Sequence, residues 1–416
     1  MIIGFVGLSH LGLVSLCAAA NKGCNVIAYD FYINAKVINA NKIGINEPGL
    51  NSIFKKNKKR IKITTNIQDL SKCDLIYISK DVPTNSNGKS DLKPIKKIIK
   101  HLSFLKKKPI LIILSQVNPG FTRNINWNKK KLFYQVETLV FGNALKRALK
   151  PERIIIGSNG SNKRIEPKLK SFLNKFKCPI LNMNYESAEL AKISINMFLV
   201  SSITTANVLS ELSTRIGAHW TDISKALKLD KRIGGHAYLS PGLGISGGNL
   251  ERDINSVIQM NKKMNLDSKM FEYWKKKSGY YKNWPIRKFL ELKKKIRINN
   301  ISILGLTYKP DTDSLKNSPS LEIISKLKRE YSLTLYDPVI KSLTSKNYNF
   351  SNSIIEAVKD SDLIFIMTPW KQFKILNSKK ITKMLSRKII IDPFEVIVDK
   401  LLIKNNKKYF SINKRI

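Results

Sequence analysis

Cysteine is scarce in this chain of 416 residues, and the four that it has follow no recognisable pattern. Their spacing fits neither a zinc site nor a disulfide framework, so we expect no metal ion and a reducing, cytoplasmic location. Long apolar runs are missing as well, and none is long enough to span a bilayer. The N-terminus has no basic region ahead of its first apolar residues, so we expect no signal peptide and no membrane partner.

Acidic residues are also few, with 30 Asp and Glu against 74 Lys and Arg, which gives a formal net charge of +44. Such a charge is typical of nucleic-acid binding, which stays open as an alternative. However, the basic residues are mostly Lys, are spread along the whole chain, and accompany an excess of Ile and Asn. This pattern indicates an AT-rich codon bias, so we expect no nucleic-acid partner. A basic surface still favours an anionic ligand such as a nucleotide sugar.

The length allows two or three domains, each with its own core. Short apolar strands alternate with helical segments, which predicts parallel, doubly wound sheets. The predicted fold class is therefore α/β, with two Rossmann-like doubly wound domains joined by a central long-helix region. We place the domains at residues 1–184, 185–290 and 291–416.

The first motif follows a predicted strand at residues 2–6. Gly7 and Gly12 match a dinucleotide fingerprint whose middle glycine is replaced by Ser9, where the added Cβ crowds a diphosphate. Asp30 ends the second predicted strand, eighteen residues beyond Gly12, which is the spacing of a carboxylate that holds the adenosine ribose. No arginine follows it directly, so the motif favours NAD over NADP. The alternative is a Rossmann-like domain that has lost its cofactor.

Further strands are predicted at residues 74–79, 109–115 and 132–136. Ligands gather at the carboxyl ends of parallel strands, which makes the polar residues that follow these strands candidates for a site. These residues are Thr84, Ser115, Gln116 and Glu137. Each one alone is more often a plain turn or surface residue, and that interpretation stays open.

The middle of the chain contains a long helix and a glycine loop. Apolar residues recur at helical spacing from Tyr185 to about Ile216, which is typical of a dimer seam or a bridge between domains. Lys192 and Asn196 lie four residues apart on that helix and share a face. The loop at 238–253 has four glycines in seven residues, which leaves the backbone open to a ligand.

The last third of the chain is a second α/β segment with strands predicted at 300–306, 333–337, 362–367 and 388–392. It has no glycine fingerprint, so we expect it to bind something other than a dinucleotide. The basic tail at 404–416 is expected to be loosely ordered.

Taken together, these motifs resemble the UDP-glucose/GDP-mannose dehydrogenase family of nucleotide-sugar 6-dehydrogenases. The resemblance covers residues 1–399 and rests on ordered matches that include Gly7–Gly12 with Asp30, Glu47–Leu50, Glu186–Asn196 and Pro241–Asp253. It implies a homodimer that binds NAD and a UDP- or GDP-linked sugar. The family oxidises the sugar C6 alcohol to a carboxylate with two NAD, through a cysteine thiohemiacetal and thioester.

The resemblance also assigns site residues. Those matched to catalytic positions, where Lys and Asn stabilise oxyanions and Asp assists proton transfer, are Lys192, Asn196, Asp253, Asn249 and Glu137. Those matched to the cofactor are Gly7, Leu11, Gly12, Asp30, Thr84, Gln116 and Lys316. Those matched to the sugar nucleotide, the first of them reaching across the dimer, are Arg232, Tyr238, Gly242, Gly244 and Lys309.

Several positions depart from the family pattern. Asn249 stands where the family has its catalytic cysteine, and Arg252 stands where it has a lysine. Gln116 replaces a threonine, and Val140 with Phe141 replaces an Arg-Glu pair. Asparagine cannot form a thioester, so two versions of the activity stay open: one hydride transfer only, or a second oxidation through a hydrated aldehyde with Asp253 or Glu137 as base. A non-catalytic protein that binds NAD and a nucleotide sugar, as a sensor or as partner of an active paralogue, is the alternative.

Overall fold

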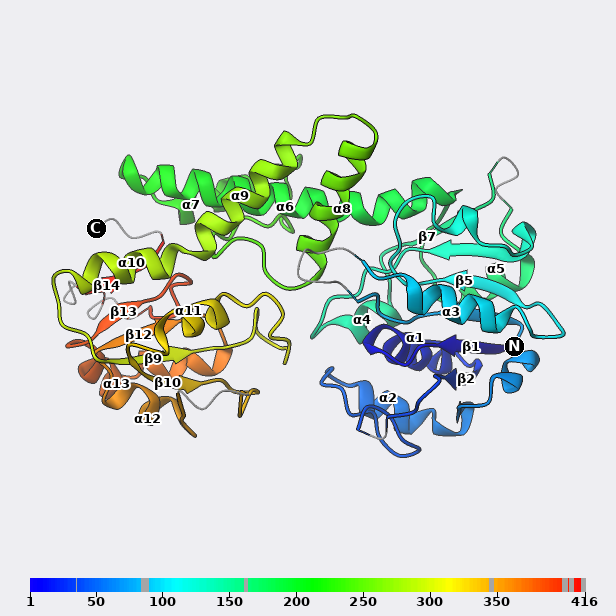
Figure 1. The fold of residues 1–416 in the computed structure, drawn as a ribbon, viewed down its shortest axis with the longest axis horizontal. Coiled ribbons are helices and arrows are strands. Elements are labelled where there is room, and N and C mark those ends of the chain that lie inside the picture. The colour runs from blue at the N-terminus through cyan, green and yellow to red at the C-terminus, as the bar shows by residue number, and fades with distance from the viewer. Residues whose placement is uncertain are drawn as a thin grey trace. The chain divides into compact units, whose positions relative to one another are not determined.

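A computed structural model describes residues 1–34, 36–83, 90–160, 164–343, 348–398, 403 and 408–412 (Figure 1). The chain divides into two compact units, Met1–Ile195 and Asn196–Ile416, which are described one at a time.

The first unit is built on an eight-stranded sheet with the order β3-β2-β1-β4-β5-β6-β7-β8. Its first six strands have the Rossmann order, in which strands are added first on one side of β1 and then, from β4 onward, on the other. The strands are β1 Ile2–Val6, β2 Asn25–Tyr29, β3 Ile61–Thr64, β4 Leu75–Ile78, β5 Ile110–Ile113, β6 Leu132–Gln135, β7 Ile154–Ser158 and β8 Ile180–Asn184. One pairing, β6 with β7, is antiparallel and departs from the expected parallel sheet. The chain therefore enters β7 from the same end of the sheet at which it leaves β6.

Helices cover both faces of this sheet, as a doubly wound fold requires. One face is packed by α1 His10–Asn21, α2 Leu50–Lys56, α4 Ala144–Leu149 and α5 Pro167–Asn174. The other is packed by α3 Lys93–Leu102 and by the first turns of α6. Helix α1 is apolar around most of its circumference, and its small residues Ala18–Ala20 are buried because it lies directly on the sheet. Short 3-10 turns complete the unit at Lys58–Arg60, Ile67–Lys72, Thr122–Asn124 and Lys129–Lys131.

Helix α6, Tyr185–Arg215, confirms the long helix predicted from the apolar spacing. It is the one described helix that is long and apolar enough to cross a membrane by length and composition, although no unbroken apolar run was expected to do so. The difference arises because polar residues interrupt its apolar stretches. Two of these, Glu189 and Asn196, are buried and hydrogen-bonded to other parts of the chain. Such contacts are those of a helix in a protein interior.

Among the described residues, the second unit contains the rest of α6, four helices that precede its sheet, and a six-stranded parallel sheet with three helices of its own. The four preceding helices are α7 Trp220–Leu229, α8 Asn249–Lys263, α9 Lys269–Lys282 and α10 Trp284–Lys293. The strands are β9 Asn300–Leu304, β10 Ser332–Tyr336, β11 Asn349–Phe350, β12 Leu363–Ile366, β13 Ile389–Ile391 and β14 Tyr409–Phe410. Their order, β11-β10-β9-β12-β13-β14, repeats the Rossmann order of the first unit.

Both faces of the second sheet are covered as well. Helix α10 and α11 Pro319–Leu327 pack on one face, and α12 Ile354–Lys359, α13 Lys379–Leu385 and the 3-10 turn Lys371–Asn377 pack on the other. The tail differs from its expected loose order, because β14 pairs with β13 and the Tyr409 hydroxyl donates to buried Asp392 at 3.1 Å. The other tail residues, apart from 403 and 408–412, lie outside the described residues.

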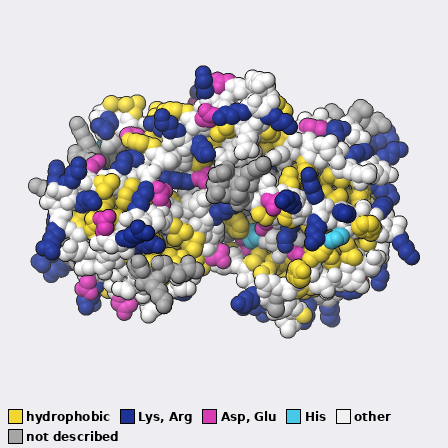
Figure 2. Space-filling view, viewed as in Figure 1, with side chains coloured by type: hydrophobic (Ala, Val, Ile, Leu, Met, Phe, Trp, Pro, Cys, Tyr) yellow, Lys and Arg dark blue, Asp and Glu magenta, His cyan; other side chains and the backbone are white. Residues whose placement is uncertain are grey.

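Basic side chains are scattered over the visible surface, interspersed with acidic and apolar ones, and form no single stripe there (Figure 2). This distribution agrees with the even spread of Lys along the sequence.

Candidate functional site

The first candidate site lies at the carboxyl end of β1. Gly7 has a φ of +98°, and a Cβ on it would lie 2.6 Å from the Lys80 backbone. Gly12 lies in the first turn of α1, where a Cβ would lie 2.1 Å from the Gly7 carbonyl oxygen and 2.8 Å from Ser79 Oγ. Both positions therefore require glycine. The tight turn and the close helix contact predicted from the fingerprint are present.

Asp30 lies beside this turn, at the end of β2. Its Oδ2 accepts a hydrogen bond from the Leu8 amide at 2.9 Å, and its Oδ1 accepts one from the Phe31 amide at 2.8 Å. Lys80 Nζ lies 3.0 Å from Oδ2 and forms an ion pair with it. The carboxylate is thus fixed at the mouth of the glycine turn, where a ribose hydroxyl would be held. Sequence reasoning missed Lys80, which lies fifty residues further along the chain.

Ser9, expected to crowd a diphosphate, has a structural role of its own. Its hydroxyl donates to the Ser79 carbonyl at 3.0 Å and accepts from the Asp81 amide at 3.1 Å. These contacts tie the glycine turn to the segment after β4. The side chain is therefore turned toward that segment. Thr84, another expected cofactor residue, lies outside the described residues.

The segment that carries Glu137 is held by a buried carboxylate from elsewhere in the unit. Glu47 accepts hydrogen bonds from three amides of the 142–145 segment, at 3.0, 2.7 and 3.3 Å. It also lies 3.0 Å from His10 Nε2, and the His10 ring packs in a tilted arrangement against Phe141, with 4.3 Å between the ring centroids. Glu137 is half-buried, and its carboxylate accepts from the Leu139 amide. This segment follows β6 at the carboxyl edge of the sheet, where ligands bind.

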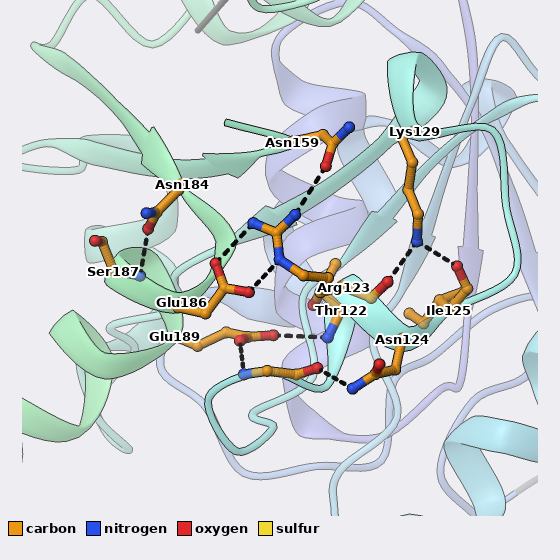
Figure 3. A network of polar contacts seen from close by, with 11 residues as sticks. Thr122, Arg123, Asn124, Ile125, Lys129, Asn159, Asn184, Glu186, Ser187 and Glu189 are labelled. Carbon is orange, nitrogen blue, oxygen red and sulfur yellow. Dashed lines mark hydrogen bonds and ion pairs between the residues drawn. The ribbon is translucent and has the colours of Figure 1, made fainter. Parts of the chain in front are cut away.

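A second network fixes the segment that follows β5, and Figure 3 shows its contacts around Thr122 and Arg123. Glu189 of α6 accepts from the Gly120 amide at 2.6 Å and from the Thr122 amide at 2.9 Å. Burial raises the pKa of Glu189, and the two amide bonds oppose that rise. Arg123 in turn holds Glu186 through two nitrogens at 2.5 and 2.9 Å. The N-terminal turns of α6 therefore anchor this segment to the sheet.

In the second unit, Asn196 of α6 and Asp253 of α8, both matched to catalytic positions, are in contact. Asp253 is 1% exposed, and Asn196 Nδ2 donates to its Oδ2 at 2.5 Å. Arg252 Nε donates to Oδ1 of the same carboxylate at 3.0 Å. Lys192 precedes Asn196 by one turn on α6 and is also buried. A buried carboxylate with an amide and a guanidinium on it can accept or hold a proton in a fixed direction.

Asn249 is the first residue of α8 and follows the glycine loop directly. Its side chain is exposed, and the helix places the positive end of its dipole there. A thiol at this position would have a lowered pKa. The amide of asparagine can donate a hydrogen bond to an oxyanion but cannot act as nucleophile and leaving group.

The glycine loop lines a cavity of about 460 Å³ together with the carboxyl ends of β9, β12 and β13. Residues at this cavity include Tyr238, Gly242, Gly244, Lys309 and Phe394. A Cβ on Gly242 would come within 3.3 Å of the Phe394 ring, and one on Gly244 within 2.7 Å of the Ser278 carbonyl oxygen. The structure therefore brings four of the five predicted sugar-nucleotide residues to one pocket.

The two remaining basic residues of the prediction lie elsewhere in the second unit. Arg232 is exposed and forms an ion pair with Asp230 at 2.6 Å, on the turn after α7, away from the lining of that cavity. Lys316, matched to the cofactor, packs its side chain on Gly248 in the glycine loop. Burial lowers the pKa of Lys316, and nearby Arg252 lowers it further while Glu251 raises it.

None of the four cysteines supplies the missing thiol in this unit, because all of them belong to Met1–Ile195. Cys24, Cys73 and Cys178 precede β2, β4 and β8, at or near the start of each strand. Burial raises the pKa of Cys73 and of Cys17 to about 12, and it also raises the pKa of Cys24 and Cys178. The thiols of Cys17, Cys24 and Cys73 are buried and therefore poor nucleophiles, whereas Cys178 is half-buried.

The comparison with known proteins decides the family. The chain matches the NAD binding domain of the UDP-glucose/GDP-mannose dehydrogenase family at residues 1–176, its central domain at 186–277 and its UDP binding domain at 302–399. A UDP-glucose 6-dehydrogenase of Rickettsia bellii is 31% identical over an alignment that covers 100% of both chains. This chain belongs to the UDP-glucose/GDP-mannose dehydrogenase family.

Solved structures show the same fold. A UDP-glucose dehydrogenase from Pyrobaculum islandicum superposes with a TM-score of 0.86 at 23% identity and covers 99% of this chain and 98% of its own. A UDP-ManNAc dehydrogenase from Pyrococcus horikoshii has a TM-score of 0.84 at 22% identity, with 100% of both chains covered. The predicted family, the α/β fold class, the dehydrogenase class and NAD as cofactor are thus confirmed.

Proposed function

We propose that this chain oxidises the C6 alcohol of a UDP-linked sugar with NAD and releases the aldehyde after one hydride transfer. The buried hydrogen bond between Asn196 and Asp253 is the observation that carries this proposal. These residues are retained as a paired set although the thiol is absent. A buried carboxylate that is held by an amide and a guanidinium beside a ligand loop is a typical arrangement of a catalytic site.

The first unit fits the cofactor. Gly7 and Gly12 permit the close backbone approaches that form the tight turn, where a Cβ would meet Lys80 or the Gly7 carbonyl oxygen, and Asp30 lies at the mouth of that turn. We assign cofactor contacts to these residues and to Leu11, Thr84, Gln116 and Lys316. In the family pattern, Gln116 stands near the nicotinamide and Lys316 stands where an arginine reaches toward the cofactor. NAD, when bound, supplies the acceptor for the hydride. The adenosine ribose is held by Asp30.

The pocket of the second unit holds the sugar nucleotide. Tyr238, Gly242 and Gly244 line it from the glycine loop, and Lys309 gives it a cation for the diphosphate. Arg232 adds a second cation to the partner subunit's pocket in a homodimer, which accounts for its exposure in a single chain. The protein acts in the cytoplasm and is divided at 1–184, 185–290 and 291–416.

In the reaction, the C6 hydroxyl loses a proton and the C6 carbon loses a hydride, which leaves an aldehyde. Lys192 and Asn196 stabilise the alkoxide that develops on the oxygen. Asp253 and Glu137 are the carboxylates that take up the proton. Asn249 donates its amide to the same oxygen in place of the family's thiol.

The second oxidation needs a tetrahedral adduct of the aldehyde. The family makes it with a thiolate, and neither Asn249 nor any of the four cysteines provides one. Hydration of the aldehyde would supply a slower substitute, so we expect product release to compete successfully with it.

The test is the number of NADH formed per sugar consumed, with NAD, a panel of UDP- and GDP-sugars, and the product identified by mass. We expect one NADH and a product two hydrogens lighter than a UDP-sugar. Two NADH, with a gain of one oxygen and a loss of two hydrogens, would overturn the one-step proposal. Binding of NAD and a sugar without any NADH would leave a non-catalytic protein.

A substitution tests the place of Asn249. We expect Asn249→Cys to raise acid formation, from one NADH per sugar toward two, because the α8 N-terminus favours the thiolate. Asn249→Ser is the matched control, since a hydroxyl has the size of the thiol without its nucleophilicity. Equal acid yields from both variants, with folding and sugar binding intact, would contradict the placement of Asn249 at the nucleophile's position.

A further inference from the structure

Lys80 gives the cofactor site a cation that the fingerprint alone does not contain. β1 lies between β2 and β4 in the sheet, so the residues that follow β2 and β4 flank the glycine turn from its two sides. Asp30 follows β2 directly, and Lys80 lies two residues beyond β4. The Lys80 ammonium meets the Asp30 carboxylate at 3.0 Å across this turn.

The backbone of Lys80 is fixed in this position. Its carbonyl accepts a hydrogen bond from Ser115 Oγ at 2.6 Å. On the other side, Gly7 packs against the Lys80 backbone so closely that a Cβ on Gly7 would lie only 2.6 Å from it. The side chain is 38% exposed, against 12% for Asp30. The ammonium can therefore leave the carboxylate for a ligand anion while the stem stays in place.

A carboxylate at this point selects NAD because it accepts hydrogen bonds from the ribose hydroxyls and repels a 2′-phosphate. Sites that take NADP have a basic residue nearby that pairs with the phosphate. Here both kinds of group are present within one ion pair. The cation is Lys80, which follows β4, on the other side of β1 from Asp30. The absence of an arginine directly after Asp30 therefore does not by itself decide between NAD and NADP.

We propose that Lys80 is a specificity-determining residue that makes the cofactor site accept NADP as well as NAD. With NAD, Lys80 stays on Asp30 Oδ2 while Oδ1, which accepts only the Phe31 amide among described donors, receives a ribose hydroxyl. With NADP, the ammonium neutralises the carboxylate and pairs with the 2′-phosphate. This inference rests on the proposed function for the identity of the site.

The experiment measures binding of NAD and of NADP separately, by calorimetry on the full chain without any sugar. Lys80→Met removes the charge and keeps most of the stem. We expect it to weaken NADP on the order of tenfold, the effect of losing one charge-assisted hydrogen bond, and to change NAD less than threefold. Lys80→Arg should restore NADP binding. Asp30→Asn should weaken NAD and spare NADP.

A protein this basic attracts NADP by its overall field, so a matched control is needed. Lys168 forms an ion pair with Asp74 at 2.6 Å, just before β4 begins, at the opposite edge of the sheet. Lys168→Met removes the same charge from the same unit and should leave both affinities unchanged. Loss of NADP binding in this control as well would show that net charge, not Lys80, is responsible.

The outcomes separate the two proposals. If wild-type chain binds NAD but discriminates against NADP by a hundredfold or more, or if Lys80→Met weakens both equally, the specificity inference is wrong and the proposed oxidation stands. If neither dinucleotide binds, the proposed function itself fails.

Discussion

Two helix glycines allow the steric argument for the cofactor site to be tested by one kind of substitution. Gly12 lies in α1 and Gly279 lies in α9, and both are followed by further helical residues. Replacing either by alanine raises helix propensity by about 1 kcal/mol. Gly12 lies in the first turn of its helix and Gly279 in the last turn of α9, but the larger difference is what the new methyl meets, so the pair mainly compares packing.

At Gly279 nothing lies within 4 Å of the added Cβ. We therefore expect Gly279→Ala to stabilise its helix by roughly 0.5–1 kcal/mol. At Gly12 the methyl would lie 2.1 Å from the Gly7 carbonyl oxygen, well inside the roughly 3.5 Å of a favourable contact. Gly7 cannot retreat, because its amide is bonded to the Tyr29 carbonyl at 2.9 Å and its α-carbon lies against Lys80.

The cost at Gly12 is that of overpacking a rigid core, about 1–3 kcal/mol or more, and it exceeds the propensity gain. We expect Gly12→Ala to destabilise the first unit by about 2 kcal/mol net and to lower NAD affinity by more than tenfold. Hydrogen exchange measured by mass spectrometry should show faster exchange in β1 and α1, with α9 unchanged. Full protection of β1 together with normal NAD binding in Gly12→Ala would refute the reasoning.

Two further predictions concern buried carboxylates. Glu47→Ala leaves three amides of the 142–145 segment without their acceptor. We expect it to destabilise that segment by on the order of 3 kcal/mol, measured by hydrogen exchange. The control is Glu166→Ala, which removes a carboxylate that caps α5 and should cost about 1 kcal/mol. Burial raises the pKa of Asp392 to about 6 from an ordinary value of 3.8, so the folded state binds its proton more tightly than the unfolded state. Stability relative to Asp392→Asn should therefore fall by roughly 3 kcal/mol as the pH rises from about 4 to 6, then level off; an unchanged difference in urea unfolding would contradict it.

Local patterns in the sequence predicted most of the fold. The apolar runs gave β1, β4 and β5 to within one or two residues at each end, and helical spacing gave α6 to within one residue of its observed end. The antiparallel pairing of β6 with β7 was not predicted, because strand direction depends on where the connection returns. The two-residue strand β14 was missed since its order comes from Tyr409 binding Asp392, a contact absent from the local sequence.

The same division applies to the site. Gly7, Gly12 and Asp30 were predicted because their roles follow from short spacings around one turn. Lys80, which pairs with Asp30, and Glu47, which holds the 142–145 segment, act across fifty and more than ninety residues of chain. In the sequence, Lys80 is visible only as a charged residue after a predicted strand, and Glu47 only as part of a turn motif. The roles assigned to Lys192, Asn249 and Glu137 stay predictions until the substitutions are made.

The two sheets offer an internal comparison that explains why only the first half has the features of a dinucleotide site. Gly305 repeats the turn of Gly7, with a φ of +89° and a Cβ position 2.6 Å from Thr368, which stands where Lys80 stands in the first unit. Asp337 repeats Asp30 and accepts from the Leu306 amide at 2.7 Å.

The carboxylates differ in what remains available. Asp337 is 1% exposed, and its two oxygens also accept from the Thr307, Val339 and Ile340 amides and from Trp370 Nε1. A carboxylate so fully engaged has no capacity for a ribose. Asp30 keeps an oxygen with one described donor and shares the other with a lysine that can move. The carboxylate at this turn is therefore fully engaged in internal contacts in the second half, whereas in the first half it keeps the capacity that the proposed cofactor site requires.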